Sequence, residues 1–190
     1  MVSAHRLSGP RKLGSVGRAI SGVTVSIQDD EDRSRPVGEI GEVCVKGPNV
    51  MVGYYRSPEE TARTVRDGWL HTGDMGRLDA DGFLFIVERK KDLIIRGGFN
   101  IYPREVEEAL YAHPQVAEAA VVGMKDPVMG EDVVAFVVVK DRQSASAEEI
   151  AAFCETRLAR FKCPKQIRFV DSLPKSPIGK ILRKELRTQV

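Results

Sequence analysis

The sequence predicts an α+β protein in which an all-β segment precedes a small α+β domain. Between residues 23 and 89, apolar and polar side chains mostly alternate, which is the period of half-buried strands. Residues 90–190 instead mix capped helical stripes with runs of β-branched residues, as in a three-stranded sheet packed against helices. We therefore expect two domains, over residues 1–89 and 90–190.

The first domain is expected to start as a loop and to continue as strands. Residues 1–22 are rich in Gly, Ser and basic side chains, which is typical of a loop. Residues 23–27 and 42–47 alternate on either side of a polar turn, and residues 68–98 predict two or more further strands joined by turns. These strands have no evident way to close a sheet of their own.

One helix and one tight turn interrupt these strands. Ser57 is expected to be the N-cap of the helix, with Pro58 at its first position and Glu60 completing a capping box. The pair Asp81-Gly82 is expected to form a hairpin turn. A calcium loop is disfavoured there because the further carboxylates and the terminal Glu of such a loop are missing.

The second domain contains two clear helix starts. Pro103 takes the first position of one helix, which presents Val106, Ala109 and Leu110 on one face. The other helix begins after residue 146, where "SAEE" forms a capping box. Its apolar stripe comprises Ile150, Phe153, Cys154, Leu158 and Phe161.

Strands are expected in the same domain at residues 116–124, 133–140 and 167–171. The first two are mostly apolar and rich in β-branched residues, which indicates that they are covered on at least one side. A proline-containing loop and a basic tail follow the last strand.

The composition excludes several classes of function. The chain has 29 Lys and Arg against 27 Asp and Glu, a net charge of +2 that is too small to predict nucleic-acid binding. No apolar run is long enough for a transmembrane segment, and the N-terminus lacks the apolar core of a signal peptide. Three scattered cysteines favour reduced thiols over disulfides or a metal site. A cytoplasmic protein is therefore expected.

Three features in the middle of the chain are not explained by core packing. Asp74 lies in the Gly-punctuated turn "HTGDMG", where its carboxylate can stabilise the turn or accept hydrogen bonds from a ligand. The charged run at residues 88–92 is either a solvated linker or a hinge. Gly97 and Gly98 allow a turn or the close approach of a ligand. Taken singly, each feature leaves both interpretations open.

The fourth feature is Lys180 in "PKSPIGKILRKEL". A P-loop is excluded because Pro174 replaces the first Gly and Ile181 replaces the Ser or Thr of that motif. A helix should not cross Pro174 and Pro177, so Lys180 is expected on a loop. Locally it could still be one more cation of a basic tail.

In combination and in this order, the motifs are far more specific. "TGD" at 72–74, "ERKKDLIIRGGFNIYPREVE" at 88–107 and "PKSPIGKILRKEL" at 174–186 resemble those of the adenylate-forming, or AMP-binding, enzymes. "GSVGRAISGVTVSI" at 14–27 fits as well, so the resemblance covers nearly the whole chain. The second and third motifs are most similar to the acyl-CoA synthetase branch. This resemblance implies that residues 1–89 are a partial β-barrel segment of a large domain and that residues 90–190 are its C-terminal lid domain.

The resemblance also implies roles for individual residues. Asp74 matches the carboxylate that binds the ribose hydroxyls of ATP, and Arg89 matches an arginine that holds the nucleotide. Lys91 matches the hinge between an adenylating and a thioester-forming pose. Gly97 and Gly98 match a loop that lines the pantetheine tunnel of CoA.

Lys180 matches the catalytic lysine of the first half-reaction. An ammonium group there stabilises the charge that develops on the α-phosphate when a carboxylate attacks it. The implied substrates are a carboxylic acid, ATP and CoA, with Mg²⁺ held mainly outside this segment and no metal ligand assigned within it. The implied partner is the protein's own N-terminal domain, whose phosphate loop has no counterpart in residues 1–30.

We therefore expect the C-terminal portion of an ATP-dependent acid–thiol ligase, inactive as a 190-residue chain. Two alternatives remain open. One is a non-catalytic binding or regulatory remnant, and the other is an adenylating enzyme that loads a carrier protein in place of CoA.

Overall fold

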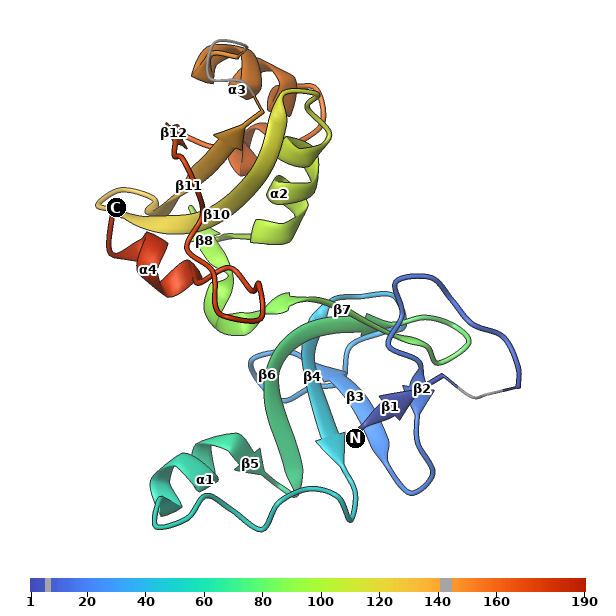
Figure 1. The fold of residues 1–190 in the computed structure, drawn as a ribbon. Coiled ribbons are helices and arrows are strands. Elements are labelled where there is room, and N and C mark those ends of the chain that lie inside the picture. The colour runs from blue at the N-terminus through green and yellow to red at the C-terminus, as the bar shows by residue number, and fades with distance from the viewer. Residues whose placement is uncertain (6–7, 141–144) are drawn as a thin grey trace. The chain divides into compact units, whose positions relative to one another are not determined.

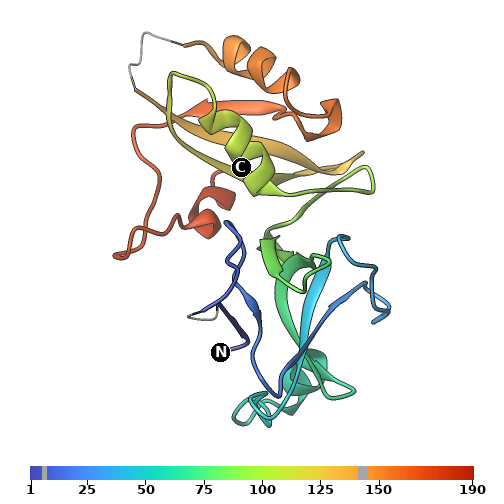
Figure 2. The same cartoon turned by 90° about the vertical axis from the view of Figure 1, so that its right-hand side faces the viewer.

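The computed structural model describes residues 1–5, 8–140 and 145–190, and the chain forms two compact units (Figures 1 and 2). The first unit is Met1–Lys91 and the second is Asp92–Val190. The α+β class predicted from the sequence is confirmed. Each unit has its own hydrophobic core and is described by itself below.

The first unit is built on an antiparallel sheet that curls into half a barrel, most visibly along β6 and β7 (Figure 1). The hydrogen-bonded order is β3-β4-β6-β5, and β7 also pairs with β6. The core on one face contains Ile27, Val43, Val45 and Leu84. The bounds are β3 Thr24–Gln28, β4 Gly41–Lys46, β5 Val65–Arg66, β6 Trp69–Leu78 and β7 Leu84–Arg89; a separate pair joins β1 Ser3–Ala4 and β2 Arg18–Ala19.

The hairpin between β6 and β7 confirms the predicted Asp-Gly turn. Gly82 has φ +77° and donates its amide to Asp79 O at 2.9 Å. The Asp79 carboxylate accepts from the amides of Asp81 and Phe83 at 3.0 and 2.9 Å, respectively. A side chain at residue 82 would be strained at this positive φ, which explains the glycine.

Helix α1 (Pro58–Thr64) begins where the sequence predicts, but its capping box does not form. Ser57 has ψ 71° and makes no side-chain cap hydrogen bond. Its hydroxyl instead donates to the Glu60 carboxylate at 3.4 Å. An N-cap hydroxyl needs an extended backbone to face the free amides of the first turn, and Ser57 lacks that conformation.

The second unit contains a mixed sheet of five strands, where the sequence predicted three. Its order is β10-β11-β8-β9, and β12 pairs with residues 134–137 of β11 in parallel. The additional strands β8 and β9 have three residues each and are joined by the Gly97-Gly98 turn, so they lack a readable alternation. The bounds are β8 Ile94–Arg96, β9 Phe99–Ile101, β10 Val116–Asp126, β11 Gly130–Val139 and β12 Gln166–Phe169.

Helices cover both faces of this sheet. Both α2 (Pro103–Tyr111) and α3 (Ala147–Glu155) pack on one face, and α4 (Arg183–Arg187) packs on the other through the buried Leu186. The capping box of Ser146 and Glu149 is confirmed. Because α3 ends at Glu155, the predicted stripe residues Leu158 and Phe161 lie beyond the helix, although both still pack against the core. Two 3-10 turns complete the elements, η1 Lys90–Asp92 and η2 Arg160–Lys162.

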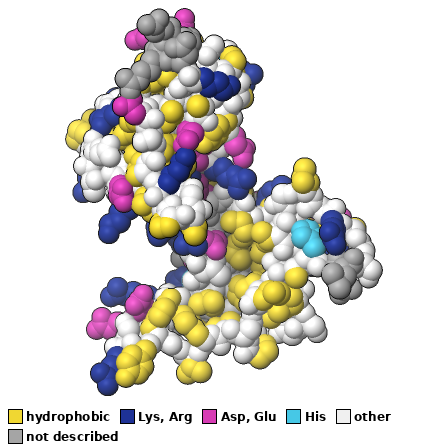
Figure 3. All heavy atoms as spheres, in the orientation of Figure 1, with side chains coloured by type: hydrophobic (Ala, Val, Ile, Leu, Met, Phe, Trp, Pro, Cys, Tyr) yellow, Lys and Arg dark blue, Asp and Glu magenta, His cyan; other side chains and the backbone are white. Residues whose placement is uncertain are grey.

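On the face shown in Figure 3, dark blue basic and magenta acidic side chains lie among larger yellow hydrophobic areas. Among the described residues, no helix has both the length and the apolar character needed to cross a membrane.

Candidate functional site

The first unit brings Asp74 and Arg89 together. The two residues are register partners on the adjacent strands β6 and β7, and Arg89 Nε lies 3.2 Å from Asp74 Oδ1. Both side chains are partly exposed, so this ion pair adds little to stability and leaves both groups accessible to a ligand. A carboxylate that accepts hydrogen bonds and a planar guanidinium that donates them form a suitable set for a ribose and its phosphates.

A bulge in β6 gives Asp74 its position. In the pairing of β4 with β6, Glu42 lies opposite Met75 and Cys44 lies opposite His71. β6 therefore has two extra residues between these pairs, which are looped out around Gly73. Within the bulge, Thr72 Oγ1 accepts from the Asp74 amide at 3.1 Å and donates to Val43 O at 2.8 Å. Gly73 has φ +71°, a conformation that favours glycine. Thr72 and Gly73 therefore fix the backbone that carries the Asp74 carboxylate.

Glu42, which was not identified from the sequence, stabilises this bulge through a hydrogen bond to its backbone. Its buried carboxylate accepts from the Gly73 amide at 3.0 Å and from Lys90 Nζ at 2.9 Å. Burial raises the pKa of Glu42, but the Lys90 ammonium and the Gly73 amide outweigh it and hold that pKa below its usual value. Glu42 links the bulge beside Asp74 to the residue that follows Arg89.

His71 and Cys44 form the rest of the polar cluster beneath the bulge. Arg66 Nη2 donates to His71 Nδ1 at 2.7 Å, and Cys44 Sγ lies 3.3 Å from the same nitrogen. Burial raises the pKa of Cys44 to about 12, so the side chain remains a thiol and is not a nucleophile. Beside this cluster is an open cleft of about 660 Å³, lined by Glu42, Tyr54, Ala62, Arg63, Thr64, Arg66, His71, Thr72, Gly73 and Lys90.

Lys91, the predicted hinge, lies in η1 and is exposed. It is the last residue of the first unit, and Asp92 begins the second. A few residues between two compact units can absorb a large change in φ and ψ, so this position is compatible with a hinge.

Gly97 and Gly98 form the turn between β8 and β9. Their φ angles are +56° and +82°, as in a two-residue type I′ hairpin turn. A Cβ atom on Gly97 would lie 2.6 Å from Met129 Cε. The backbone alone therefore accounts for both glycines, and their predicted contact with CoA remains a prediction.

Lys180 lies on an exposed turn, as the sequence predicts. Ser176 organises this turn, because its amide donates to Lys180 O at 2.8 Å and its Oγ accepts from the Lys180 amide at 3.1 Å. Gly179 has φ +80° and completes the turn. Among the described residues, no ion pair or hydrogen bond involves the Lys180 ammonium.

The basic neighbours of Lys180 are mostly paired. Lys175 contacts Glu118 at 2.7 Å, Arg183 contacts Glu107 at 2.7 Å, and Arg187 contacts Asp92 at 2.9 Å. Within the described part of this tail, the exposed Lys184 is the one other lysine or arginine whose side chain forms no ion pair. The structure thus distinguishes Lys180 from most of the cations around it.

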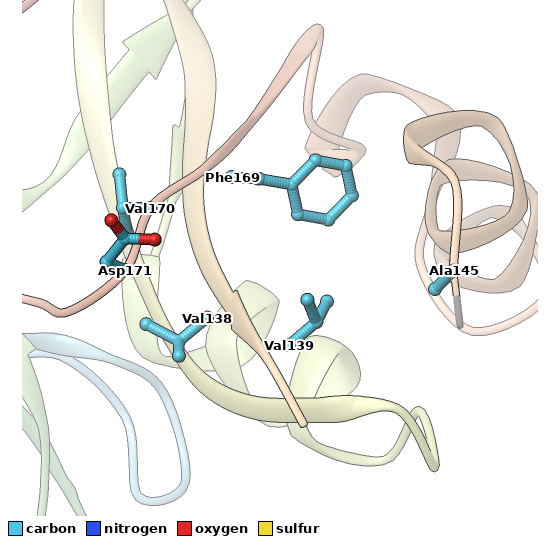
Figure 4. Close-up of a pocket in the computed structure, with 6 residues that line it drawn as sticks. All are labelled: Val138, Val139, Ala145, Phe169, Val170 and Asp171. Atoms are coloured by element: carbon cyan, nitrogen blue, oxygen red, sulfur yellow. The ribbon is translucent and has the colours of Figure 1, made fainter. Parts of the chain in front are cut away.

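A second hollow, of about 560 Å³, lies in the second unit at the end of β11 (Figure 4). The Phe169 ring and Val139 face it, and the other lining residues in the figure are Val138, Ala145, Val170 and Asp171. No site residue predicted from the sequence lines this hollow, and we assign it no role. Within the described residues, no group of three or more His, Cys, Asp and Glu side chains is arranged to hold a metal ion.

Comparisons with known proteins identify the family. Residues 1–55 match the model of the AMP-binding enzyme family, and residues 105–180 match that of the AMP-binding enzyme C-terminal domain. The chain is 50% identical over 185 residues to a long-chain-fatty-acid–CoA ligase of Bacillus subtilis, covering 96% of the chain and 33% of the relative. It is 47% identical over 179 residues to a 2-succinylbenzoate–CoA ligase of Bacillus thuringiensis, covering 94% of the chain and 36% of the relative.

The solved structures agree with this assignment. The ATP-bound MatB of Rhodopseudomonas palustris superposes with a TM-score of 0.93 at 40% identity, covering 100% of this chain and 38% of that one. This chain spans about a third of the length of the curated relatives it matches. These matches show that the chain is a C-terminal part of an AMP-binding, adenylate-forming enzyme, homologous to long-chain-fatty-acid–CoA ligases.

Proposed function

We propose that this chain supplies the ribose-binding pair and the catalytic lysine of an ATP-dependent acyl-CoA synthetase, an AMP-forming acid–thiol ligase. The observation that carries the proposal is the pairing of Asp74 with Arg89 at 3.2 Å, since these residues come from two separate motifs. The similarity to two acid–CoA ligases supports the reaction class.

The proposed reaction has two steps. In the first, a substrate carboxylate attacks the α-phosphorus of ATP, and pyrophosphate leaves to give an acyl-adenylate. Asp74 accepts hydrogen bonds from the ribose hydroxyls, Arg89 donates to nucleotide oxygens, and the Lys180 ammonium neutralises charge that builds up on the α-phosphate. In the second, the thiol of CoA loses its proton and attacks the acyl carbonyl, and AMP leaves.

Lys180 suits this role because its ammonium is exposed and has no partner among the described residues. A lysine that already neutralised a carboxylate would first have to lose that ion pair. Gly97 and Gly98 are proposed to contact the pantetheine arm, and Lys91 is proposed as the hinge between the two steps. A cytoplasmic location remains a prediction.

We further propose that the 190-residue chain is inactive alone and requires the N-terminal region that its relatives carry. A fusion tests this, in which the chain replaces the matching third of the Bacillus subtilis ligase. The fusion should catalyse carboxylate-dependent ATP–pyrophosphate exchange and should form the acyl-CoA, whereas the chain alone should do neither. Exchange by the chain alone would refute the requirement, and an inactive but folded fusion would contradict the proposed function.

The relatives differ in the acids that they activate, since one is named for long-chain fatty acids and the other for 2-succinylbenzoate. We therefore propose only a carboxylic acid as the substrate of this chain's protein. A carrier-protein thiol as the acceptor can be tested in the fusion by competition between CoA and a phosphopantetheinylated carrier. A purely regulatory remnant would restore activity neither in the fusion nor when mixed with an N-terminal fragment.

A further inference from the structure

The Gly97-Gly98 turn rests on a buried ionic network in the second unit. Asp132, on β11, is completely buried, and its Oδ1 lies 2.7 Å from Nε of Arg96. Arg96 is the last residue of β8, directly before Gly97. The Asp132 carboxylate also forms an ion pair with Lys165, at the start of the segment leading into β12.

The contact between Asp132 and Arg96 is mainly electrostatic. Neither Arg96 Nε nor Asp132 Oδ1 has a well-aligned hydrogen bond, although the two atoms are close. The guanidinium is aligned by a different contact, in which Arg96 Nη1 donates to Phe161 O at 3.0 Å. The negative charge of Asp132 therefore attracts the Arg96 guanidinium, and the hydrogen bond to Phe161 O fixes its orientation.

The other side of the turn is held by residues 126–130. Gly97 donates its amide to Met129 O at 2.8 Å, and Arg96 pairs with Gly130. The amides of Met129 and Val128 both donate to the Asp126 carboxylate at 2.9 Å. Together with Lys165, these amides hold the pKa of Asp126 well below its usual range.

Lys165 connects Asp126 to Asp132. Its ammonium contacts Asp126 at 3.0 Å as well as the buried Asp132. The Asp132 and Asp126 carboxylates raise the pKa of Lys165, so it remains charged near neutral pH. One network thus fixes the residue before the turn, through Arg96, and the loop beneath it, through Asp126.

We infer that Asp132 is a positioning residue for the Gly97-Gly98 turn and that it acts through Arg96. The alternative is that the Asp132–Arg96 ion pair only stabilises the second unit. Positioning is favoured because Arg96, the partner of Asp132, directly precedes the turn in sequence, and because both glycines and the flanking Ile95 and Phe99 are exposed. An exposed two-residue turn depends on contacts with neighbouring segments, here those of Arg96 and the Met129 backbone, to fix its place.

This inference rests on the proposed function, which assigns the Gly97-Gly98 turn to the thioester step. In the fusion described above, Asp132→Asn should lower thioester formation from supplied acyl-adenylate by roughly ten- to a hundredfold, because a displacement of about 1 Å can cost about that much. ATP–pyrophosphate exchange should stay within about twofold of wild type. Glu108→Gln is the matched control, since it removes a carboxylate from an exposed ion pair of the same unit.

Amide hydrogen exchange in the 190-residue chain tests the positioning role without any activity. Asp132→Asn should speed the exchange of the Gly97 amide by about tenfold or more while the Ala135 amide, in the middle of β11, is unchanged. Lys165→Gln perturbs the same network from its half-exposed side and should have a smaller effect in the same direction, so a poorly folded Asp132→Asn chain does not prevent the test.

Several outcomes would overturn the inference. One is an equal loss in both half-reactions, and another is unchanged thioester formation in a folded Asp132→Asn fusion. Equal Gly97 exchange in the wild-type and Lys165→Gln chains would also contradict it. A wild-type fusion that makes no acyl-adenylate would count against the proposed function, and the exchange comparison would still decide the positioning role.

Discussion

Glu42→Gln should destabilise the first unit in a pH-dependent way. The substitution keeps the shape of the side chain and an oxygen for the Gly73 amide, but it removes the negative charge that Lys90 contacts at 2.9 Å. A hydrogen bond between charged groups contributes about 1.5–3 kcal/mol. Because Lys90 is 39% exposed and also contacts Asp30, solvent screening reduces the expected loss to about 1–2 kcal/mol.

The fluorescence of Trp69 provides the assay. It is the only tryptophan of the chain and lies in β6, so it reports unfolding of the first unit separately from the second. With a urea m-value of about 1–2 kcal/mol per M for a unit of this size, the midpoint should fall by roughly 1 M at pH 7. Glu39→Gln is the matched control, because it removes a carboxylate from an exposed ion pair and should cost less than about 0.5 kcal/mol.

The pH dependence gives the prediction its sign. The folded-state pKa of Glu42 lies below the ordinary value of 4.5, so the unfolded chain takes up the proton first as the pH falls. The contribution of the carboxylate is therefore complete above pH 4.5 and disappears as the pH falls through the folded-state pKa. The difference between wild type and Glu42→Gln should shrink over that interval. A difference that stays constant between neutral and acidic pH, or no difference at pH 7, would refute the reasoning.

Three further substitutions test the remaining roles. Lys180→Ala in the fusion should lower ATP–pyrophosphate exchange by about 10²–10³-fold and largely spare thioester formation from supplied acyl-adenylate; equal losses would contradict its assignment to the first step. Lys91→Pro should do the reverse in the same two assays, because a fixed φ restricts the proposed hinge, and a variant with both rates intact would speak against that hinge. Gly97→Val should destabilise the second unit by about 1–3 kcal/mol in urea unfolding followed by circular dichroism, because φ there is +56° and Met129 lies in the way; an unchanged midpoint would show that the turn adapts.

Elements with signals in the adjacent sequence could be predicted. Pro103 and the Ser146–Glu149 capping box start α2 and α3 as expected, because each signal acts within one helical turn. Ser57 carries the same kind of signal and still fails, because ψ at that residue does not turn its hydroxyl toward the free amides. Local sequence therefore located the helix starts but did not determine every hydrogen bond at them.

Strand β8 was predicted only as one of two or more strands within residues 68–98, and β9 was not predicted. Each has three residues, and the segment around them reads as a charged run followed by two glycines. The pairing of Arg96 with Gly130 joins residues that are far apart in sequence. The network of Asp132, Arg96 and Lys165 depends on that pairing, so none of its members could be identified before the strands were placed.

The candidate site likewise contains residues that the sequence identified and residues that it did not. Asp74 and Arg89 were identified from their motifs, and the structure brings them into contact. Glu42 was missed because the alternation in β4 places it on the same face as Cys44. A face that carries a carboxylate is ordinarily expected to be exposed to solvent. In the folded chain, all residues of β4 from Gly41 to Val45 are buried, with apolar residues on one face and a polar cluster around His71 on the other. A buried polar face leaves no periodic signal that differs from an exposed one.

The surroundings of Lys180 show how an exposed loop can still be well defined. Arg183 and Arg187 anchor α4 through Glu107 and Asp92, so the segment after the loop has a fixed base. Ser176 closes the turn through its amide and its hydroxyl. The backbone contacts thus hold the turn, while the Lys180 side chain takes no part in holding it. An ammonium group that contributes nothing to its own loop can move to a ligand without loss of local structure, which supports the role proposed for Lys180 in the first of the two steps.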